Sequence, residues 1–385
     1  MKRPVIIACG RTPIGRAHKD KGVYRNIRSD DLATHVVRTV VERSGIDPQE
    51  IEDVVLGNAF PQGEQGLNVG RAVALMAGLP LHVGGTTVNR WCGSSLQAVN
   101  QAAHAIIAGA EDVQVVGGLE HMQHVPMDTI GEINPKLFTR TSKAALMMGI
   151  TAEFLAQSNN ISRAEQDAFA LRSHQRAAQA QARGEFAAEM TPLWGHDEQG
   201  ERVWVDRDQC VRADSTLETL GNLPPAFMPG LGTVTAGNSS PLSDGAAALV
   251  IMSEEKAKSL GLKPLVRILA TSVVGVEPSV MGTGPIPATK KVLARAGMSV
   301  KDIDLIELNE AFASQAITCL QALELDEEKL NVRGGAIAIG HPLGASGARI
   351  STTLIHAMLD RGANVGLATM CIGMGQGIAT LFERV

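Results

Sequence analysis

The stretch Arg43–Phe60, RSGIDPQEIEDVVLGNAF, returns 252 residues later as Arg295–Phe312, RAGMSVKDIDLIELNEAF. The two stretches align without a gap and share Arg, Gly, Ile, Leu, Ala and Phe at equivalent places. The same offset relates the apolar segment 112–118 to the apolar segment 364–370. Two matches at one offset predict an internal duplication of the chain.

Apolar strands alternate with helical segments in each half of the expected duplication. Residues 31–43 and 94–108 are helical in pattern and lie between short apolar runs. This alternation predicts an α/β fold with a mixed, mostly parallel sheet flanked by helices. The apolar part of residues 1–8 is too short for a signal peptide, and we expect it to form a buried first strand.

The two halves differ in one insertion. The final strand of the second half, 378–382, follows soon after the matched segment, whereas its counterpart at 248–252 comes much later in the first half. We therefore expect two core halves and an inserted loop domain. Their residues are 1–118 with 241–264 for the first half, 119–240 for the insertion and 265–385 for the second half.

The insertion at 119–240 contains one clear helix signal. Ser162 and Glu165 form a capping-box pattern, which predicts a helix over 162–183. An insertion of this size above a duplicated core is suited to covering a long substrate.

Composition limits the classes of function. The chain has 385 residues, 44% of them hydrophobic, and a formal net charge of −5. No basic block suggests nucleic acid, and no stretch is long enough for an integral membrane segment. Its five cysteines are odd in number and lack CxxC spacing, which argues against a disulfide framework or a metal site. We expect a protein of the cytoplasm.

Cys92 is the first candidate for chemistry. It lies in Asn89–Ser95, NRWCGSS, directly before a good helix start. A helix N-terminus stabilises a thiolate, so this position favours a nucleophile. A buried inert thiol is the commoner fate of a cysteine in an apolar chain. The polar residues around Cys92 favour the reactive interpretation.

His341 is the second candidate, in Gly340–Gly347, GHPLGASG. It follows the apolar run 336–340, and we expect a strand-to-loop break there. A lone histidine is most often structural, but the glycines and Pro342 predict a tight loop that presents the imidazole at a site. His18, His121 and His124 lack such a setting, and we expect them to be loop residues.

Cys371 and Asn309 complete the candidate set. Cys371 ends the apolar strand 366–370, and a second thiol suits acid/base work beside a nucleophilic one. Asn309 breaks an apolar strand with polar groups, either as a structural amide with satisfied partners or as a holder of a water or an oxyanion. Cys9, Cys210 and Cys319 are expected to be packed, inert thiols.

Together these residues resemble the thiolase family, and the resemblance covers essentially the whole chain. Six blocks match in order: Arg11–Gly15, Asn89–Ser95, Gly232–Ser240, Asn309–Phe312, Gly340–Pro342 and Cys371–Gly373. The resemblance implies a duplicated, five-layered α-β-α-β-α sandwich. Because the family is generally dimeric, it also implies a homodimer.

The resemblance implies thiolysis of 3-ketoacyl-CoA by CoA, an acetyl-CoA C-acyltransferase reaction that needs no cofactor because CoA is a substrate. Cys92 would attack the 3-keto carbon after His341 removes its proton. Cys371 would protonate the departing acetyl-CoA carbanion and then deprotonate CoA. Asn309, through a water, and His341 would form one oxyanion hole, and the backbone N–H groups of Cys92 and Gly373 the other.

By the same resemblance, seven residues would line the CoA and acyl site: Arg212, Thr219, Ser240, Ala311, Phe312, Met147 and Met148. Short-chain biosynthetic thiolases carry a His-Met pair where this chain has Met147 and Met148. The departure at Met147 argues against restriction to acetoacetyl-CoA, because two flexible apolar side chains suit a longer acyl chain. Trp91 is a bulky neighbour of the nucleophile.

Three functions compete. Residues 118–127 and 377–385 are similar to the 3-ketoacyl-CoA thiolases that form the β subunit of the bacterial fatty-acid oxidation complex, where a thiolase dimer pairs with hydratase/dehydrogenase α subunits in a heterotetramer. Residues 282–288 and Ala345 look more like a biosynthetic acetoacetyl-CoA thiolase (acetyl-CoA C-acetyltransferase). A non-catalytic acyl-CoA or lipid-binding protein is opposed by the retention of two thiols, His341 and Asn309.

Overall fold

One large sheet runs through the molecule. The computed structural model describes residues 2–127 and 133–385, so residues 128–132 of the expected insertion lie outside the described residues. Within the described chain the sheet has the order β10-β11-β12-β9-β1-β8-β5-β3-β4, with β2 paired to β8. Its strands are β1 (Pro4–Arg11), β2 (Gly15–Arg16), β3 (Asp53–Gly57), β4 (Thr86–Val88), β5 (Val113–His121), β8 (Ser243–Ser253), β9 (Val266–Gly275), β10 (Leu305–Leu308), β11 (Val365–Ile372) and β12 (Gln376–Arg384).

The sheet is built from two similar halves. Strands β3 and β5 pair in parallel with Asp53 opposite Gln114, and β10 and β11 pair in parallel with Leu305 opposite Gly366. The second pair has the register of the first, displaced by 252 residues. The two halves meet at β1 and β9, which pair antiparallel at two positions near their N-terminal ends.

Helices cover both halves and lie between them. The core helices are α1 (Ser29–Ser44), α2 (Val69–Met76), α3 (Ser94–Ala108), α7 (Glu254–Ser259), α8 (Pro285–Ala296), α9 (Ala313–Leu323), α10 (Ala336–Ile339) and α11 (Ser346–Arg361). The bounds of α3 agree with the prediction, and α1 extends slightly beyond its predicted ends at 31 and 43. Both α3 and α11 end before a glycine in the left-handed conformation, Gly109 and Gly362, which glycine adopts without a Cβ penalty.

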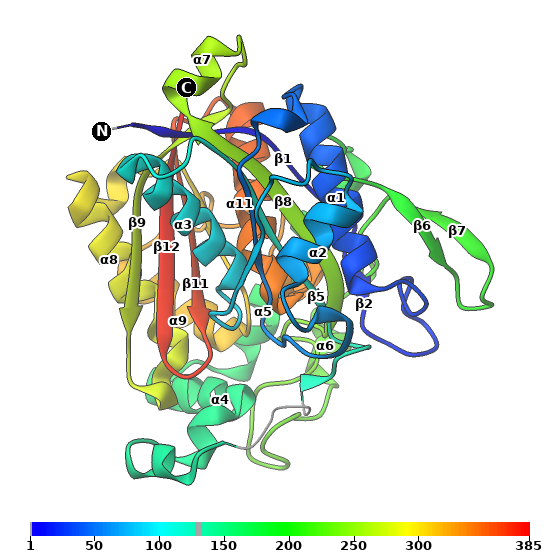
Figure 1. Cartoon of the computed structure of the whole chain (residues 1–385). Coiled ribbons are helices and arrows are strands. Elements are labelled where there is room, and N and C mark those ends of the chain that lie inside the picture. Colours follow the sequence, from blue (N-terminus) through cyan, green and yellow to red (C-terminus); the bar gives the residue numbers. More distant parts are fainter. Residues whose placement is uncertain (1, 128–132) are drawn as a thin grey trace.

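The helices and the two halves of the sheet form five layers, and three apolar cores lie between these layers. The first core joins α1 and α2 to the first half of the sheet, and the second joins α3 and α11 to both halves. The third core joins α8 and α9 to the second half. Figure 1 shows this sequence of layers from α8 on the left to α1 on the right. The predicted five-layered α-β-α-β-α sandwich is therefore confirmed.

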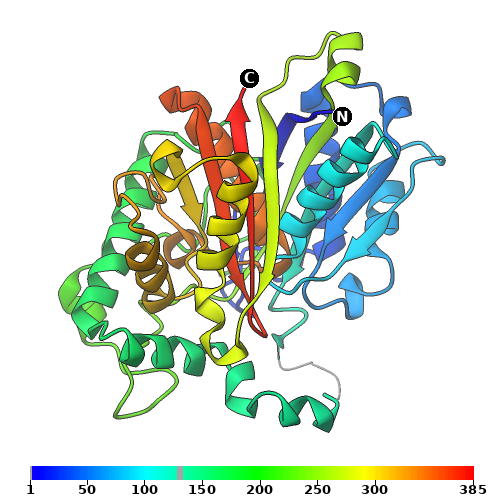
Figure 2. The ribbon, with the colours of Figure 1, turned by 90° about the vertical axis from the view of Figure 1, so that its left-hand side faces the viewer.

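The segment between β5 and β8 holds the remaining α-helices and strands of the described chain: α4 (Met148–Ser158), α5 (Arg163–Ala182), α6 (Leu217–Gly221) and the hairpin of β6 (Leu193–His196) and β7 (Arg202–Val205). The Ser162–Glu165 capping box at the start of α5 is present as predicted. Arg11 of β1 clamps this segment to the core, because its buried guanidinium pairs with Glu189 at 2.6 Å and Asp208 at 2.7 Å. Figures 1 and 2 place α4 at the end of the molecule opposite the two termini.

Two local predictions are wrong. Residues 336–339 form the single turn α10 rather than a strand, since a short apolar run has no periodicity that separates the two. The Glu310 carboxylate accepts the Ile337 N–H of this turn at 3.2 Å. His121 lies in β5 rather than a loop, fully buried, and its Nε2 donates to the Tyr24 carbonyl at 3.1 Å. Within the described chain, no helix is long and apolar enough to cross a membrane.

Candidate active site

A cavity of about 460 Å³ opens among the two core halves and the inserted segment. Its wall is almost entirely apolar and flexible, with six methionines. The lining residues are Phe60, Trp91, Cys92, Met122, Met127, Ile133, Leu137, Leu146, Met147, Met148, Gly149, Phe227, Ser239, Ser240, Pro241, Leu242, Met281, Ala311, Phe312, His341, Leu343, Cys371, Gly373 and Met374. Cys92, His341 and Cys371, far apart in the chain, therefore share one cavity.

A strained turn presents Cys92 at this cavity. Trp91 has a φ of +47°, which a bulky side chain rarely adopts, and it lies between β4 and α3. Ser94 holds the turn, because its Oγ accepts the Arg90 N–H at 2.9 Å and donates to the Trp91 carbonyl at 2.6 Å. The Trp91 ring packs edge-on against Phe60 with centroids 5.5 Å apart. These contacts fix the turn that carries Cys92 at the start of α3.

The ionisation of Cys92 differs from the sequence-based expectation. Burial raises the pKa of the Cys92 thiol to about 11, although the backbone N–H of Gly373 donates to its sulfur and acts in the opposite direction. Desolvation therefore outweighs the two backbone N–H groups, of Gly373 and of Cys92 itself, that lower the pKa of this thiol. Cys92 rests as a thiol and requires a base to become a nucleophile.

The imidazole of His341 is held in one tautomer. Ser346 Oγ lies 2.5 Å from His341 Nδ1 and 2.9 Å from the Pro342 carbonyl oxygen. The carbonyl has no proton to give, so the single hydroxyl proton of Ser346 goes to Pro342 and Nδ1 must carry the proton shared with Ser346. Nε2 is then an acceptor and receives the Asn309 Nδ2–H at 3.3 Å. The hydrogen-bond network thus leaves Nε2 unprotonated.

The surroundings of His341 keep it neutral. Burial, and then the positive charge of Arg349, lower the pKa of His341 to about 3. A neutral imidazole with an unprotonated Nε2 is the form that accepts a proton. The geometry therefore places an imidazole that can accept a proton in the same cavity as the protonated thiol of Cys92.

Cys371 lies near the end of β11, buried beside the Cys92 turn. Burial, followed by the influence of Cys92, raises the pKa of Cys371 well above the ordinary value of a thiol. The two turns are in close contact, because a Cβ on Gly93 would lie 2.6 Å from Ile372 Cδ1. Cys371 is therefore a thiol rather than a thiolate at neutral pH. The other three cysteines, Cys9, Cys210 and Cys319, are buried as expected.

The predicted substrate residues fall into two groups. Ser240, Ala311, Phe312, Met147 and Met148 line the cavity, as does Gly373. Asn309 is fully buried behind the wall and reaches the cavity through His341. Arg212 and Thr219 lie outside the cavity, exposed on the inserted segment.

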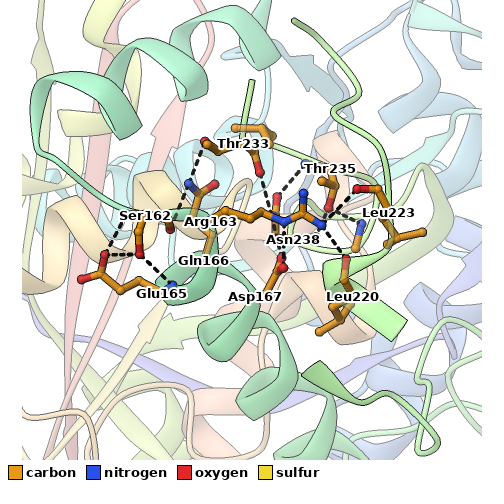
Figure 3. Close-up of polar contacts among 12 residues, drawn as sticks. Ser162, Arg163, Glu165, Gln166, Asp167, Leu220, Leu223, Thr233, Thr235 and Asn238 are labelled. Atoms are coloured by element: carbon orange, nitrogen blue, oxygen red, sulfur yellow. Dashed lines mark hydrogen bonds and ion pairs between the residues drawn. The ribbon is translucent and has the colours of Figure 1, made fainter. Parts of the chain in front are cut away.

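The first turns of α5 hold the loop that leads to Ser240 (Figure 3). Asp167 accepts the Asn238 side-chain N–H at 2.9 Å, and Gln166 donates to the Thr233 hydroxyl at 2.9 Å. Ser240 N–H then donates to the Ala311 carbonyl at 3.0 Å. The inserted segment therefore fixes part of the cavity wall to the residues after β10.

Sequence reasoning missed two residues that shape the site. Ser346 orients His341, and its only sequence signal is its place at the start of the helix after the GHPLGA turn. Glu120 is buried in β5, and burial raises its pKa to about 7. Its carboxylate accepts the N–H groups of Gly344 at 2.8 Å and Ala59 at 2.9 Å, and so ties the His341 loop to the end of β3. An acid within an apolar strand was the available signal.

Comparisons with known proteins agree with this architecture. The family model described as "Thiolase, N-terminal domain" matches residues 4–255, and "Thiolase, C-terminal domain" matches residues 262–384. The "3-ketoacyl-CoA thiolase" proteins of Aeromonas salmonicida and Shewanella frigidimarina are each 52% identical to this chain over 100% of both sequences. The crystal structure of the Bacillus anthracis acetyl-CoA acetyltransferase has a TM-score of 0.91 at 41% identity, over 100% of this chain and 99% of that one.

Proposed function

The chain belongs to the thiolase family, and from this premise we propose that it performs 3-ketoacyl-CoA thiolysis, an acetyl-CoA C-acyltransferase reaction, in fatty-acid β-oxidation. The observation that carries the proposal is the meeting of two thiols and a neutral imidazole in one apolar cavity. Full-length relatives named 3-ketoacyl-CoA thiolase support the substrate class.

In the first half-reaction, His341 Nε2 takes the proton of Cys92 and the sulfur attacks the C3 carbonyl carbon. The carbonyl electrons move to oxygen and return when the C2–C3 bond breaks. Acetyl-CoA leaves as an enolate and takes the proton of Cys371. The acyl group remains on Cys92 as a thioester, so the reaction uses no cofactor.

In the second half-reaction, the Cys371 thiolate takes the thiol proton of CoA. The CoA sulfur attacks the thioester, Cys92 leaves as a thiolate, and His341 returns its proton. Both half-reactions develop negative charge on a carbonyl oxygen, which needs hydrogen-bond donors in place. We assign Asn309, through a water, and His341 to one oxyanion, and the N–H groups of Cys92 and Gly373 to the other.

The acyl chain lies in the methionine-rich part of the cavity. Met147 and Met148 are adjacent in this wall, and Met147 is 58% exposed, so the wall can adapt to chains of different length. The exposed Arg212 and Thr219 suit the polar nucleotide end of CoA, outside the apolar cavity. This division fits a substrate with a long apolar end and a charged end.

The wider setting is also part of the proposal. Leu67, Leu75, Met76 and Leu81 are exposed apolar side chains on and beside α2, next to the edge strand β4, and they support a homodimer through this face. Five free cysteines suit the reducing cytoplasm. A hydratase/dehydrogenase α subunit is the proposed further partner.

Release of acetyl-CoA from 3-ketoacyl-CoA substrates of four to sixteen carbons tests the function, with Cys92→Ala as the inactive control. We expect equal amounts of acetyl-CoA and shortened acyl-CoA, and kcat/KM tens-fold higher for medium and long chains than for acetoacetyl-CoA. Activity confined to acetoacetyl-CoA would assign the chain to acetyl-CoA C-acetyltransferase chemistry. No release from any substrate would leave only acyl-CoA binding.

A further inference from the structure

Two buried charged side chains, Glu307 and Arg349, join the two elements that hold His341. Glu307 lies in β10 and is 2% exposed, and Arg349 lies in α11 and is 1% exposed. Arg349 Nη1 is 3.4 Å from Glu307 Oε2. Neither residue lines the cavity, so the pair does not contact a substrate bound there.

The pair runs alongside the hydrogen bonds of the imidazole. Asn309 directly follows β10, two residues after Glu307, and its N–H still donates to the Thr369 carbonyl at 3.0 Å. The backbone is therefore extended as far as Asn309, which places Glu307 and Asn309 on the same face. Arg349 follows Ser346 by three residues in α11, which makes them neighbours on the helix surface. His341 joins Asn309 to Ser346 through its two ring nitrogens. Two bridges therefore connect β10 with α11, one through the ion pair and one through the imidazole.

We propose that the Glu307–Arg349 pair is the positioning element of the proposed base: it fixes the distance between β10 and α11 at which Asn309 and Ser346 both reach His341, and it sets the positive charge of Arg349 beside the imidazole. The inference rests on the proposed function only in giving His341 the role of base.

The charge of Arg349 is not cancelled at the imidazole. Burial raises the pKa of Glu307, and the positive charge of Arg349 acts in the opposite direction. Burial also raises the pKa of Glu310, which follows Asn309, and that of Glu120, which holds the His341 loop, the latter to about 7. The carboxyl groups around the imidazole therefore carry reduced negative charge.

The thiols that share the cavity with His341 are neutral as well, because burial raises the pKa values of Cys92 and Cys371. Farther out, Arg11, Glu189 and Asp208 act on Arg349 itself. Among these groups Arg349 is the one whose charge lowers the pKa of His341, after burial. Loss of its charge would favour the imidazolium, which cannot accept the proton of Cys92.

The test separates charge from packing with three substitutions. Arg349→Gln removes the charge, Arg349→Lys keeps the charge but loses the planar fork, and Glu307→Gln keeps the charge of Arg349 while weakening the bridge. Arg333→Gln is the matched control, because Arg333 is also 1% exposed and ion-paired, but to Glu185, Glu189 and Asp360. The ring of His341 is followed by NMR in histidine-labelled protein and identified by its loss in His341→Ala.

At the lowest pH at which every variant stays folded, we expect the charged fraction of His341 to be about tenfold larger in Arg349→Gln than in the unaltered chain, which corresponds to one pKa unit. Arg349→Lys, Glu307→Gln and Arg333→Gln should keep the unaltered fraction. In thiolysis, Arg349→Lys and Glu307→Gln should lower kcat at least tenfold with little change in KM, and Arg333→Gln should lower kcat far less.

An unchanged His341 fraction in folded Arg349→Gln, or an equal rise in Arg333→Gln, overturns the electrostatic part of the proposal. An unchanged kcat in folded Glu307→Gln and Arg349→Lys overturns the positioning part. The NMR result does not depend on activity. A raised charged fraction in Arg349→Gln, found together with no thiolysis by the unaltered chain, would reject the proposed function and leave the action of Arg349 on His341 standing.

Discussion

Ser94 and Ser346 occupy the same place in the two halves of the molecule, at the first residue of α3 and of α11. Ser94 accepts the Arg90 N–H and donates to the Trp91 carbonyl, so it shapes the turn that carries Cys92. Ser346 donates to the Pro342 carbonyl and accepts the imidazole proton of His341. The same scaffold position thus holds backbone groups in the first half and the imidazole of His341 in the second.

The difference shows how a duplicated fold builds an asymmetric site. The two helix N-termini meet at the centre, where the Ala348 N–H donates to Ser95 Oγ at 2.9 Å. A Cβ on Gly347 would lie 2.3 Å from the Leu96 nitrogen, so glycine is required on one side of the contact only. The duplicated fold places two equivalent loops at one cavity. Differences in their sequences give each loop a different chemical group, a thiol in the first half and an imidazole in the second.

The largest expected effect comes from removing the reactive atom of the first half. Cys92→Ala should abolish the covalent acyl-enzyme, because no other sulfur is placed as the nucleophile, and intact-protein mass spectrometry after incubation with acyl-CoA measures this directly. Iodoacetamide should modify Cys92 faster than the buried Cys9, Cys210 and Cys319, and acetyl-CoA should protect it. Equal modification of the thiols would contradict the assignment.

The two serines provide the next comparison. Ser346→Ala should lower kcat about a hundredfold with little change in KM, because His341 loses the partner that fixes its tautomer, and general-base catalysis is worth about 10²–10⁴-fold. Ser94→Ala should instead destabilise the protein by about 1 kcal/mol, the usual net contribution of an intramolecular hydrogen bond, with a smaller effect on kcat. Steady-state kinetics and urea unfolding of both variants measure the contrast. Equal losses of kcat would show that the serines have the same role.

A smaller effect concerns Glu120, which ties the His341 loop to the first half. Its pKa of about 7 lies above the ordinary value, so between about pH 4.5 and 7 the native state holds a proton that the unfolded state has lost. Stability linked to this group is therefore fully present below about pH 4.5 and is lost as the pH rises from there to about 7. Relative to the unaltered chain, Glu120→Gln should gain roughly 3 kcal/mol between pH 5 and pH 8. Urea unfolding at both pH values checks this, and a constant difference would contradict it.

Sequence patterns predicted the scaffold well because its signals are local. The start of α3 follows a polar turn and its end precedes Gly109, and α5 carries its own capping box. The duplication was visible because the sequences around β3 and β10 align without a gap at one offset. Three features were not predictable in this way. The turn α10 depends on a distant carboxylate, and the raised pKa of Cys92 depends on how the folded chain desolvates its sulfur. The role of Ser346 depends on which residue its hydroxyl contacts in the folded chain.

The division of labour between the two halves is tested most directly by Cys371→Ala. If Cys92 carries the acyl group and Cys371 the proton, this variant should still form the acyl-enzyme from acyl-CoA. It should lose the exchange of the acetyl-CoA methyl protons with solvent deuterium. Exchange at the rate of the unaltered enzyme would contradict the account and direct attention to His341 as the acid.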